Sequence, residues 1–327
     1  MFDDLKEVTV REEILPPKSD LDKILDAEEE IIKQYENDER FKQYGGKHSE
    51  AYKSLYTIVQ EKFTGITLTP ELLQGYTDAR ENTEENTAAI IRGMYSAALL
   101  EIISTTQPEK TTVIDGKNKT FNYLFYRIHN IKNLTLHNIK GNCILYNAGS
   151  EHGSAQHITL TNIIGSHTLY NTGSEHGRAR NITLKNIKGN YPLYNAGRDN
   201  GSLQNIILDN ITGDCTLENA GFNGNAQYII LNQIRGDYTL RNISVAGSGA
   251  QKIILNKIKG DNTLLNVSVY AKEGREIREE HDLSRRQKII ISKIKKISKT
   301  IHALSLSKAK LAHDEIARLQ KEIFKEP

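Results

Sequence analysis

A repeating pattern of hydrophobic and polar positions runs through the middle of the chain. The phrase N-I-K-G recurs there with the variants N-I-I-G, N-I-T-G, Q-I-R-G and K-I-K-G. Its glycines stand 24 residues apart, with one interval of 23, at Gly141, Gly165, Gly189, Gly213, Gly236 and Gly260. A weaker copy around Gly116 precedes them. A fixed period of this length is typical of a solenoid of stacked coils, here about seven of them.

Hydrophobic residues occupy the same places in every copy. Four columns begin at Leu134, Leu136, Ile139 and Leu145 and continue at the repeat spacing. The first two columns are two residues apart, so they fall on one face of a strand, with the β-branched Thr135 between them. The pattern predicts short strands of three to five residues, separated by Gly and Asn corners. Only stacking of the coils can bury these side chains.

These repeats resemble the right-handed parallel β-helix, the architecture of pectate-lyase-like proteins, over residues 113–270. The motif indicates this architecture but no specific family, and the 24-residue period does not match the hexapeptide coils of left-handed β-helices. The resemblance implies a mainly β fold. We therefore expect a right-handed parallel β-helix solenoid between an α-helical N-terminal region and a C-terminal helix.

An asparagine follows each repeat glycine by six residues. The column contains Asn147, Asn171, Asn195, Asn219, Asn242 and Asn266. Stacked Asn side chains can hydrogen-bond along the axis, so we predict a structural ladder, with ligand binding as the alternative. Cys143 and Cys215 share one repeat position three coils apart, about 14 Å along the axis. A disulfide needs Cα atoms within about 7 Å, so both are expected to be free thiols.

The first part of the chain, residues 1–112, has helical periodicity. Helices are predicted over 19–43, 48–63 and 69–104, with Ser19 or Asp20 capping the first and Thr69-Pro70 opening the third. The apolar stretch 88–103 is expected to cover the first coil, because an open sheet edge aggregates. The three regions are therefore a helical cap (1–112), a solenoid (113–270) and a basic helical segment (271–327).

The last region combines an apolar stripe with positive charge. Steps of four and three residues connect Ile290, Ile294, Ile297, Ile301 and Leu304, which is a heptad seam. Such a helix could cap the last coil, form a homo-oligomer through the seam, or bind a polyanion such as nucleic acid. The cations for polyanion binding would be Arg285, Arg286, Lys288, Lys293, Lys295, Lys296 and Lys299.

Composition narrows the class of protein. Apolar residues make up 38% and charged residues 26% of the 327 positions, as in a folded soluble chain. The sequence contains no run of 18 apolar residues, which a membrane-spanning helix would need. The acidic N-terminus lacks the layout of a signal peptide, so we expect a cytoplasmic protein. Residues 1–112 contain 13 Lys and Arg against 23 Asp and Glu, whereas the remaining chain is basic. Such asymmetry suggests acidic and basic parts that could face each other.

The candidate chemistry lies in a repeated loop, G-S-E-H-G. Stacking would place two Glu–His pairs about 5 Å apart, where they could bind a divalent transition metal or do acid–base work. A polar exposed turn without chemistry is the alternative. The next coil has an Arg–Asp pair in the same loop. The candidate binding residues are Glu151, His152, Glu175, His176, Arg198 and Asp199.

The solenoid lacks the sequence signature of a carbohydrate-cleaving enzyme. Glycoside hydrolysis needs two close carboxylates, and the repeat contains neither D-D nor D-x-D. We therefore expect a non-catalytic structural or protein-interaction scaffold that has a protein partner and no cofactor. One alternative is a carbohydrate-binding or polysaccharide-degrading β-helix, as in phage tailspikes. The other is polyanion binding through the C-terminal segment.

Overall fold

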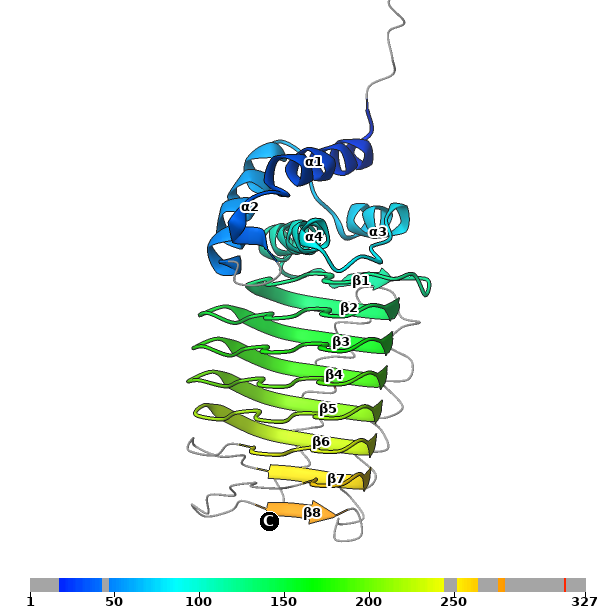
Figure 1. Ribbon diagram of the computed structural model, residues 1–327, viewed down its shortest axis with the longest axis vertical. Helices are drawn as coiled ribbons and strands as arrows, with labels where there is room; N and C mark the ends of the chain where they lie inside the picture. The colour runs from blue at the N-terminus through cyan, green and yellow to red at the C-terminus, as the bar shows by residue number, and fades with distance from the viewer. Residues whose placement is uncertain (1–17, 43–46, 244–251, 264–275, 280–314, 316–327) are drawn as a thin grey trace, which may run out of the picture.

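The computed structural model describes residues 18–42, 47–243, 252–263, 276–279 and 315. A group of helices lies over one end of a stack of parallel strands (Figure 1). Eight strands form one sheet in chain order, and each strand pairs in parallel with the next. The predicted parallel β-solenoid is therefore confirmed.

Each full coil contributes one long strand to the sheet. The strands are β1 Thr112–Asp115, β2 Asn130–Lys140, β3 Ser154–Ile164, β4 Arg178–Lys188, β5 Ser202–Thr212, β6 Asn225–Arg235, β7 Lys252–Lys259 and β8 Glu276–Glu279. The predicted strands of three to five residues were wrong, because β2 to β6 have 11 residues each. Asn138 takes the left-handed conformation (φ 56°), yet Ile139 still pairs with Ile163 beyond it. The corner therefore bends the strand without ending it.

The predicted hydrophobic columns form the core. Leu134, Leu136 and Leu145 are completely buried, and Ile139 is 1% exposed. Pairing keeps like residues together, as with Leu134 and Ile158. Each coil therefore buries its apolar side chains against those of its neighbours.

The return segment of each coil alternates between conformations. Cys143, Leu145 and Asn147 have φ values of 59°, 55° and 60°. This left-handed region costs a non-glycine residue about 1–2 kcal/mol. Their N–H groups bond to neighbouring coils, as from Cys143 to the carbonyl oxygen of Ser166 (2.9 Å). Stacking therefore offsets a local strain that a single coil could not sustain.

The N-terminal region contains α1 Asp20–Tyr35, a 3-10 turn η1 Glu39–Phe41, α2 His48–Lys62, α3 Pro70–Ala79 and α4 Thr87–Thr106. Ser19 caps α1 in a capping box, and Thr69 caps α3, as predicted. The predicted single helix over 69–104 was wrong. Residues 80–86 separate α3 from α4, because Asn82 pairs its backbone with the first coil and Asn86 caps α4.

Helix α4 packs against the first coils, which confirms the covering role predicted for residues 88–103. Within the described part of the chain, α4 is also the one helix whose length and hydropathy would suit a membrane span. Most of its side chains are buried inside the protein, as in a core helix.

The solenoid continues past its predicted end at residue 270. Glu276–Glu279 forms β8, so the prediction of a helical segment from residue 271 was wrong there. Ile277 pairs with Ile253, 24 residues earlier, so the repeat simply runs one coil further. The Ile seam from 290 to 304 and the cations from 285 to 299 lie outside the described residues.

Candidate functional site

The predicted Glu–His loops are tight turns at one corner of the solenoid. In the first, the N–H of Gly153 donates to the carbonyl oxygen of Ser150 (2.9 Å), and Glu151 and His152 have positive φ values of 50° and 69°. The next coil repeats this turn. The rings of His152 and His176 stack with centroids 5.1 Å apart and planes 6° apart. Stacking therefore brings the two loops together as the sequence suggested.

The carboxylate of Glu151 is already bound. It accepts hydrogen bonds from Arg127 of the preceding coil and from the hydroxyl of Ser49 in α2. The side chain of Arg127 is only 12% exposed, and burial lowers its pKa. Among the described residues, no group of three or more His, Cys, Asp and Glu side chains could hold a metal ion. Glu151 therefore ties the helical cap to the solenoid.

The Arg–Asp pair in the third loop is also engaged. The Nε of Arg198 lies 3.1 Å from a carboxylate oxygen of Asp199. The Arg198 guanidinium also lies over the ring of Phe222, 5.6 Å from its centroid. Arg198 therefore has both an anionic and an aromatic partner within the solenoid.

A column of tyrosines, which the sequence analysis missed, runs along the return segments. Tyr146 stacks on Tyr170 (4.7 Å, 7°), and Tyr170 stacks on Tyr194 (5.0 Å, 16°). A parallel stack joins His167 and Tyr191 (4.9 Å, 7°). Tyr170 therefore has a stacked ring on each face. The repeated phrase L-Y-N-x-G was the signal for this column.

Asparagine side chains form hydrogen-bonded ladders along the axis at several repeat positions. In the predicted column, the side-chain amide of Asn219 donates to Asn195 (3.2 Å), and that of Asn242 donates to Asn219 (2.9 Å). Asn266 lies outside the described residues. A second ladder, which the sequence analysis missed, joins Asn138, Asn162, Asn186 and Asn210 through bonds of 2.8–2.9 Å. Its signal is the first letter of the N-I-K-G phrase.

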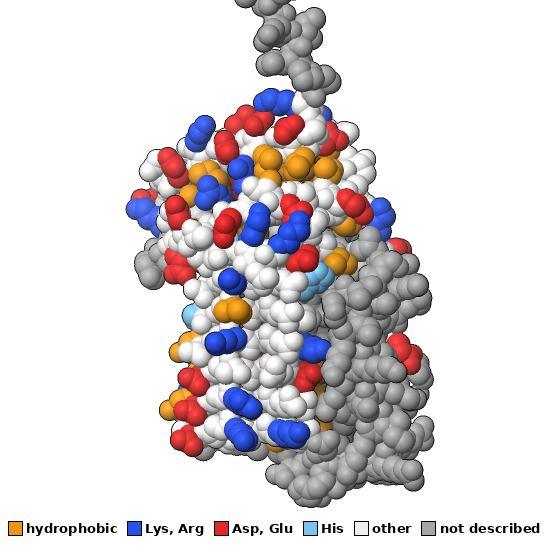
Figure 2. Space-filling model, turned by 90° about the vertical axis from the view of Figure 1, so that its right-hand side faces the viewer, with side chains coloured by type: hydrophobic (Ala, Val, Ile, Leu, Met, Phe, Trp, Pro, Cys, Tyr) orange, Lys and Arg blue, Asp and Glu red, His pale blue; other side chains and the backbone are white. Residues whose placement is uncertain are grey.

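A shallow groove follows this second ladder. It is lined by Asn162, Ile164, Asn186, Lys188, Asn210 and Thr212, among others, and we call it the amide groove. Ile164 is 49% exposed, although it is a large hydrophobic residue. Exposed cations occupy the same strand-end position in other coils, at Lys140, Lys188, Arg235 and Lys259. None of these four has an ion pair within the described ranges. Figure 2 shows basic side chains along one face of the solenoid.

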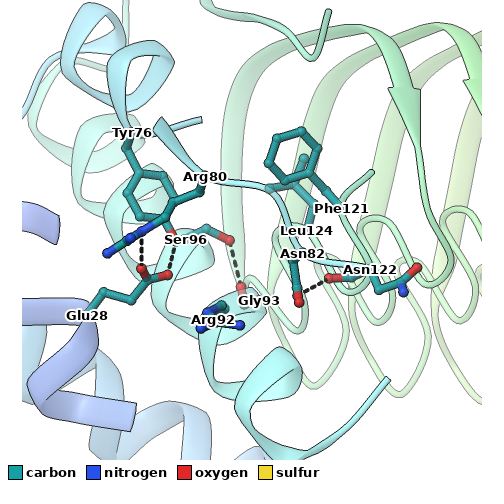
Figure 3. Close-up of a pocket in the computed structure, with 10 residues that line it drawn as sticks. All are labelled: Glu28, Tyr76, Arg80, Asn82, Arg92, Gly93, Ser96, Phe121, Asn122 and Leu124. Carbon is teal, nitrogen blue, oxygen red and sulfur yellow. Dashed lines mark hydrogen bonds and ion pairs between the residues drawn. The ribbon is translucent and has the colours of Figure 1, made fainter. Parts of the chain in front are cut away.

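A small cavity of about 20 Å³ lies where the helical cap meets the first coil, large enough for about one water molecule (Figure 3). Glu28 of α1 is 1% exposed, and burial raises its pKa. Its carboxylate accepts a hydrogen bond from the Tyr76 hydroxyl and lies 2.6 Å from the Nε of Arg80. The side-chain oxygen of Asn82 is buried there and has no hydrogen-bond partner among the residues that the structure describes. The cavity is too small for a metabolite.

A second buried carboxylate, Glu101 of α4, connects the cap to β2. It accepts hydrogen bonds from the Tyr52 hydroxyl (2.6 Å), the backbone N–H of His129 (3.0 Å) and the side-chain amide of Asn130 (2.8 Å). The donors come from α2 and the start of the second coil, so Glu101 holds three elements together. No sequence signal distinguished it from other glutamates.

We compared the chain with protein-family models, curated proteins and solved structures. No protein-family model, curated protein or solved structure matches this chain.

Proposed function

We propose that this protein is a non-catalytic scaffold that binds an acidic segment of a partner protein in the amide groove. The observation that carries this proposal is the exposed Ile164 beside Lys188, an exposed cation that forms no ion pair with any other described residue. The asparagine amides that line the groove bond to one another, so this part of its surface is preformed. An exposed apolar side chain rimmed by unpaired charge is typical of a protein-binding surface.

The spacing of the cations fits an extended peptide. Lys140 and Lys188 are two coils apart, about 10 Å along the axis, and Ile164 lies on the coil between them. An extended chain advances about 3.3 Å per residue, so acidic residues three positions apart would meet both lysines. An apolar residue between those acids would contact Ile164. The partner motif is therefore acidic–apolar–any–acidic.

The distribution of charge favours binding of an acidic peptide in the N-terminal half of the groove. Two residues after the cation position, the earlier coils have the uncharged Asn142, Ser166 and Asn190, whereas the later coils have Asp214, Asp237 and Asp261. These aspartates would repel an acidic peptide. We therefore place the binding site between β2 and β4, where complementary charge also speeds association.

The bonding of three carboxylates, two buried in the helical cap and one in a solenoid turn, supports a scaffold over a polysaccharide-degrading enzyme. Glycoside hydrolysis uses two carboxyl groups that face the substrate. Glu28, Glu101 and Glu151 are instead each bound by donors of the protein itself. Tyr170, in the middle of the tyrosine column, likewise has a ring stacked on each face, which leaves it no open face for a sugar ring.

A labelled peptide tests the proposal. A fluorescein-tagged peptide of three Glu-Leu-Ser-Glu repeats would be titrated with the full chain, and its anisotropy measured. The double variant Lys140→Glu/Lys188→Glu should weaken binding at least tenfold. The matched control is Arg178→Glu/Arg180→Glu, which reverses two exposed cations at the opposite end of β4 and should change binding less than twofold.

Three outcomes would overturn the proposal. Equal weakening by both double variants would mean general attraction to positive charge. No binding by the unmodified chain would exclude the groove as an acidic-peptide site. New reducing ends after incubation with a polysaccharide panel would show that the protein is an enzyme.

A further inference from the structure

The outward face of the sheet contains a buried stripe. The residue between the two inward columns points away from the core in every strand. From β3 to β7 this position is occupied by Thr159, Thr183, Ile207, Ile230 and Ile254. Their exposed fractions are 1%, 5%, 6%, 5% and 1%. Outward side chains of a single sheet normally contact solvent on that face, so this stripe has a cover.

The described helices do not provide the cover. Helix α3 packs on β1 and α4 packs on β2, whereas β4, β5 and β6 pack against their neighbouring strands. At the start of β4, Arg178 and Arg180 are exposed, so the burial is confined to the middle of the strands. Thr159, Lys185 and Tyr228, on or beside the stripe, each have a polar, ionic or ring contact besides those named above.

We propose that the amphipathic segment 285–304 of this chain lies along the stripe as a helix. Its apolar residues would contact the outward Thr and Ile column. From Thr159 to Ile254 the column spans four strand spacings, about 19 Å. A helix from Ile290 to Leu304 is about 21 Å long. The apolar seam and the buried stripe therefore have nearly the same length.

Chain direction and charge agree with this placement. Strand β8 ends at Glu279, at the far end of the stack, so the segment begins there and runs back toward the helical cap. At 100° per residue, Lys288, Lys295 and Lys299 lie on the side opposite the apolar seam. The segment would thus bury its isoleucines and leave these three cations in water. This proposal is independent of the amide groove, which lies at the strand ends.

Thiol accessibility tests the cover in the full chain. In the variant Thr183→Cys, the rate of maleimide labelling at position 183 would be measured by peptide mass spectrometry, which separates it from Cys143 and Cys215. Adding Ile294→Gln/Ile297→Gln/Ile301→Gln should speed labelling at least tenfold. The matched control, Lys288→Gln/Lys295→Gln/Lys299→Gln, places three glutamines on the opposite face and should change the rate less than twofold.

A second measurement needs no change in the segment. An amine-reactive cross-linker on the unmodified protein should join Lys185 of β4 to Lys296 or Lys299, because the antiparallel course brings the later residues near β4. The proposal is overturned if labelling is fast before the Ile→Gln changes, or if those changes do not speed it. It is also overturned if labelling rises on dilution, since a second copy would then be the cover. Cross-links of Lys185 to solenoid lysines alone would overturn it too.

Discussion

The contact between the helical cap and the first coil depends on one glycine. A Cβ atom at Gly93 of α4 would lie 2.2 Å from the carbonyl oxygen of Tyr123 and 2.8 Å from its Cβ. Tyr123 cannot easily retreat, because its N–H donates to the carbonyl oxygen of Asn142 (2.8 Å) in the next coil. The substitution Gly93→Ala therefore forces α4 away from the solenoid.

Two opposing effects determine how much Gly93→Ala changes the free energy of unfolding. Overpacking a close contact costs about 1–3 kcal/mol. Alanine favours the helix over glycine by about 1 kcal/mol. Gly75 of α3 is the matched control, because a Cβ there would meet only Leu21, at 3.5 Å. Gly75→Ala should stabilise the protein by up to about 1 kcal/mol. Helix preference is common to both changes, so their difference isolates the packing cost of about 1–3 kcal/mol.

Urea unfolding measures this difference. The chain has 15 tyrosines and no tryptophan, so tyrosine fluorescence follows the transition. Gly93→Ala should lower the free energy of unfolding relative to Gly75→Ala by the amount above. If the two variants have equal stability, or if Gly93→Ala is the more stable, the close approach of α4 to Tyr123 is wrong.

Three further predictions concern the solenoid and its cap. Burial raises the pKa of the Cys143 and Cys215 thiols to about 12, so both should react slowly with a disulfide reagent at pH 8 until urea is added; rapid labelling of the folded protein would contradict this. Burial lowers the pKa of His48 in the folded protein. As the pH falls, the His48 imidazole is therefore protonated first in the unfolded chain, near pH 6.5. The free energy of unfolding should consequently fall between pH 7.5 and 5.5. His48→Gln should flatten that fall in urea titrations, and an unchanged slope would exclude His48 as a cause. Asn186→Ala removes two ladder hydrogen bonds and also a residue type that tolerates the left-handed φ of 52°, so it should lower the free energy of unfolding by about 2 kcal/mol. Asn186→Gly removes the same two bonds but tolerates this φ, so it should lower the free energy of unfolding by only about 1 kcal/mol. Equal losses in urea titrations would show that backbone conformation does not matter there.

The sequence predicted those features that the repeat itself encodes. The spacing of Gly141 and its equivalents gives the coil length, and the columns from Leu134 and Leu136 give the inward face. Both cysteines are free, as expected from their separation along the axis. Each of these inferences needs only the rule that like residues stack on like residues.

Features that depend on contacts between distant segments were not predicted. The division of the 69–104 region follows from the pairing of Asn82 with the first coil, which no local propensity reveals. Glu101 looks like any helical glutamate until Tyr52 and Asn130 are placed beside it. Glu151 was expected beside its histidine, but Arg127 and Ser49 bind it instead. The continuation into β8 was overlooked because its sequence departs from the motif.

The one coil of 23 residues shows where this architecture tolerates a change in length. The turn G-R-D-N-G from Gly197 to Gly201 becomes G-F-N-G from Gly221 to Gly224, yet Ser202 still pairs with Asn225. The missing residue is absorbed in the turn, and the core columns keep their register. A peptide inserted at successive turns would therefore be displayed at steps of about 4.8 Å along the rod, so that the protein could serve as a molecular ruler.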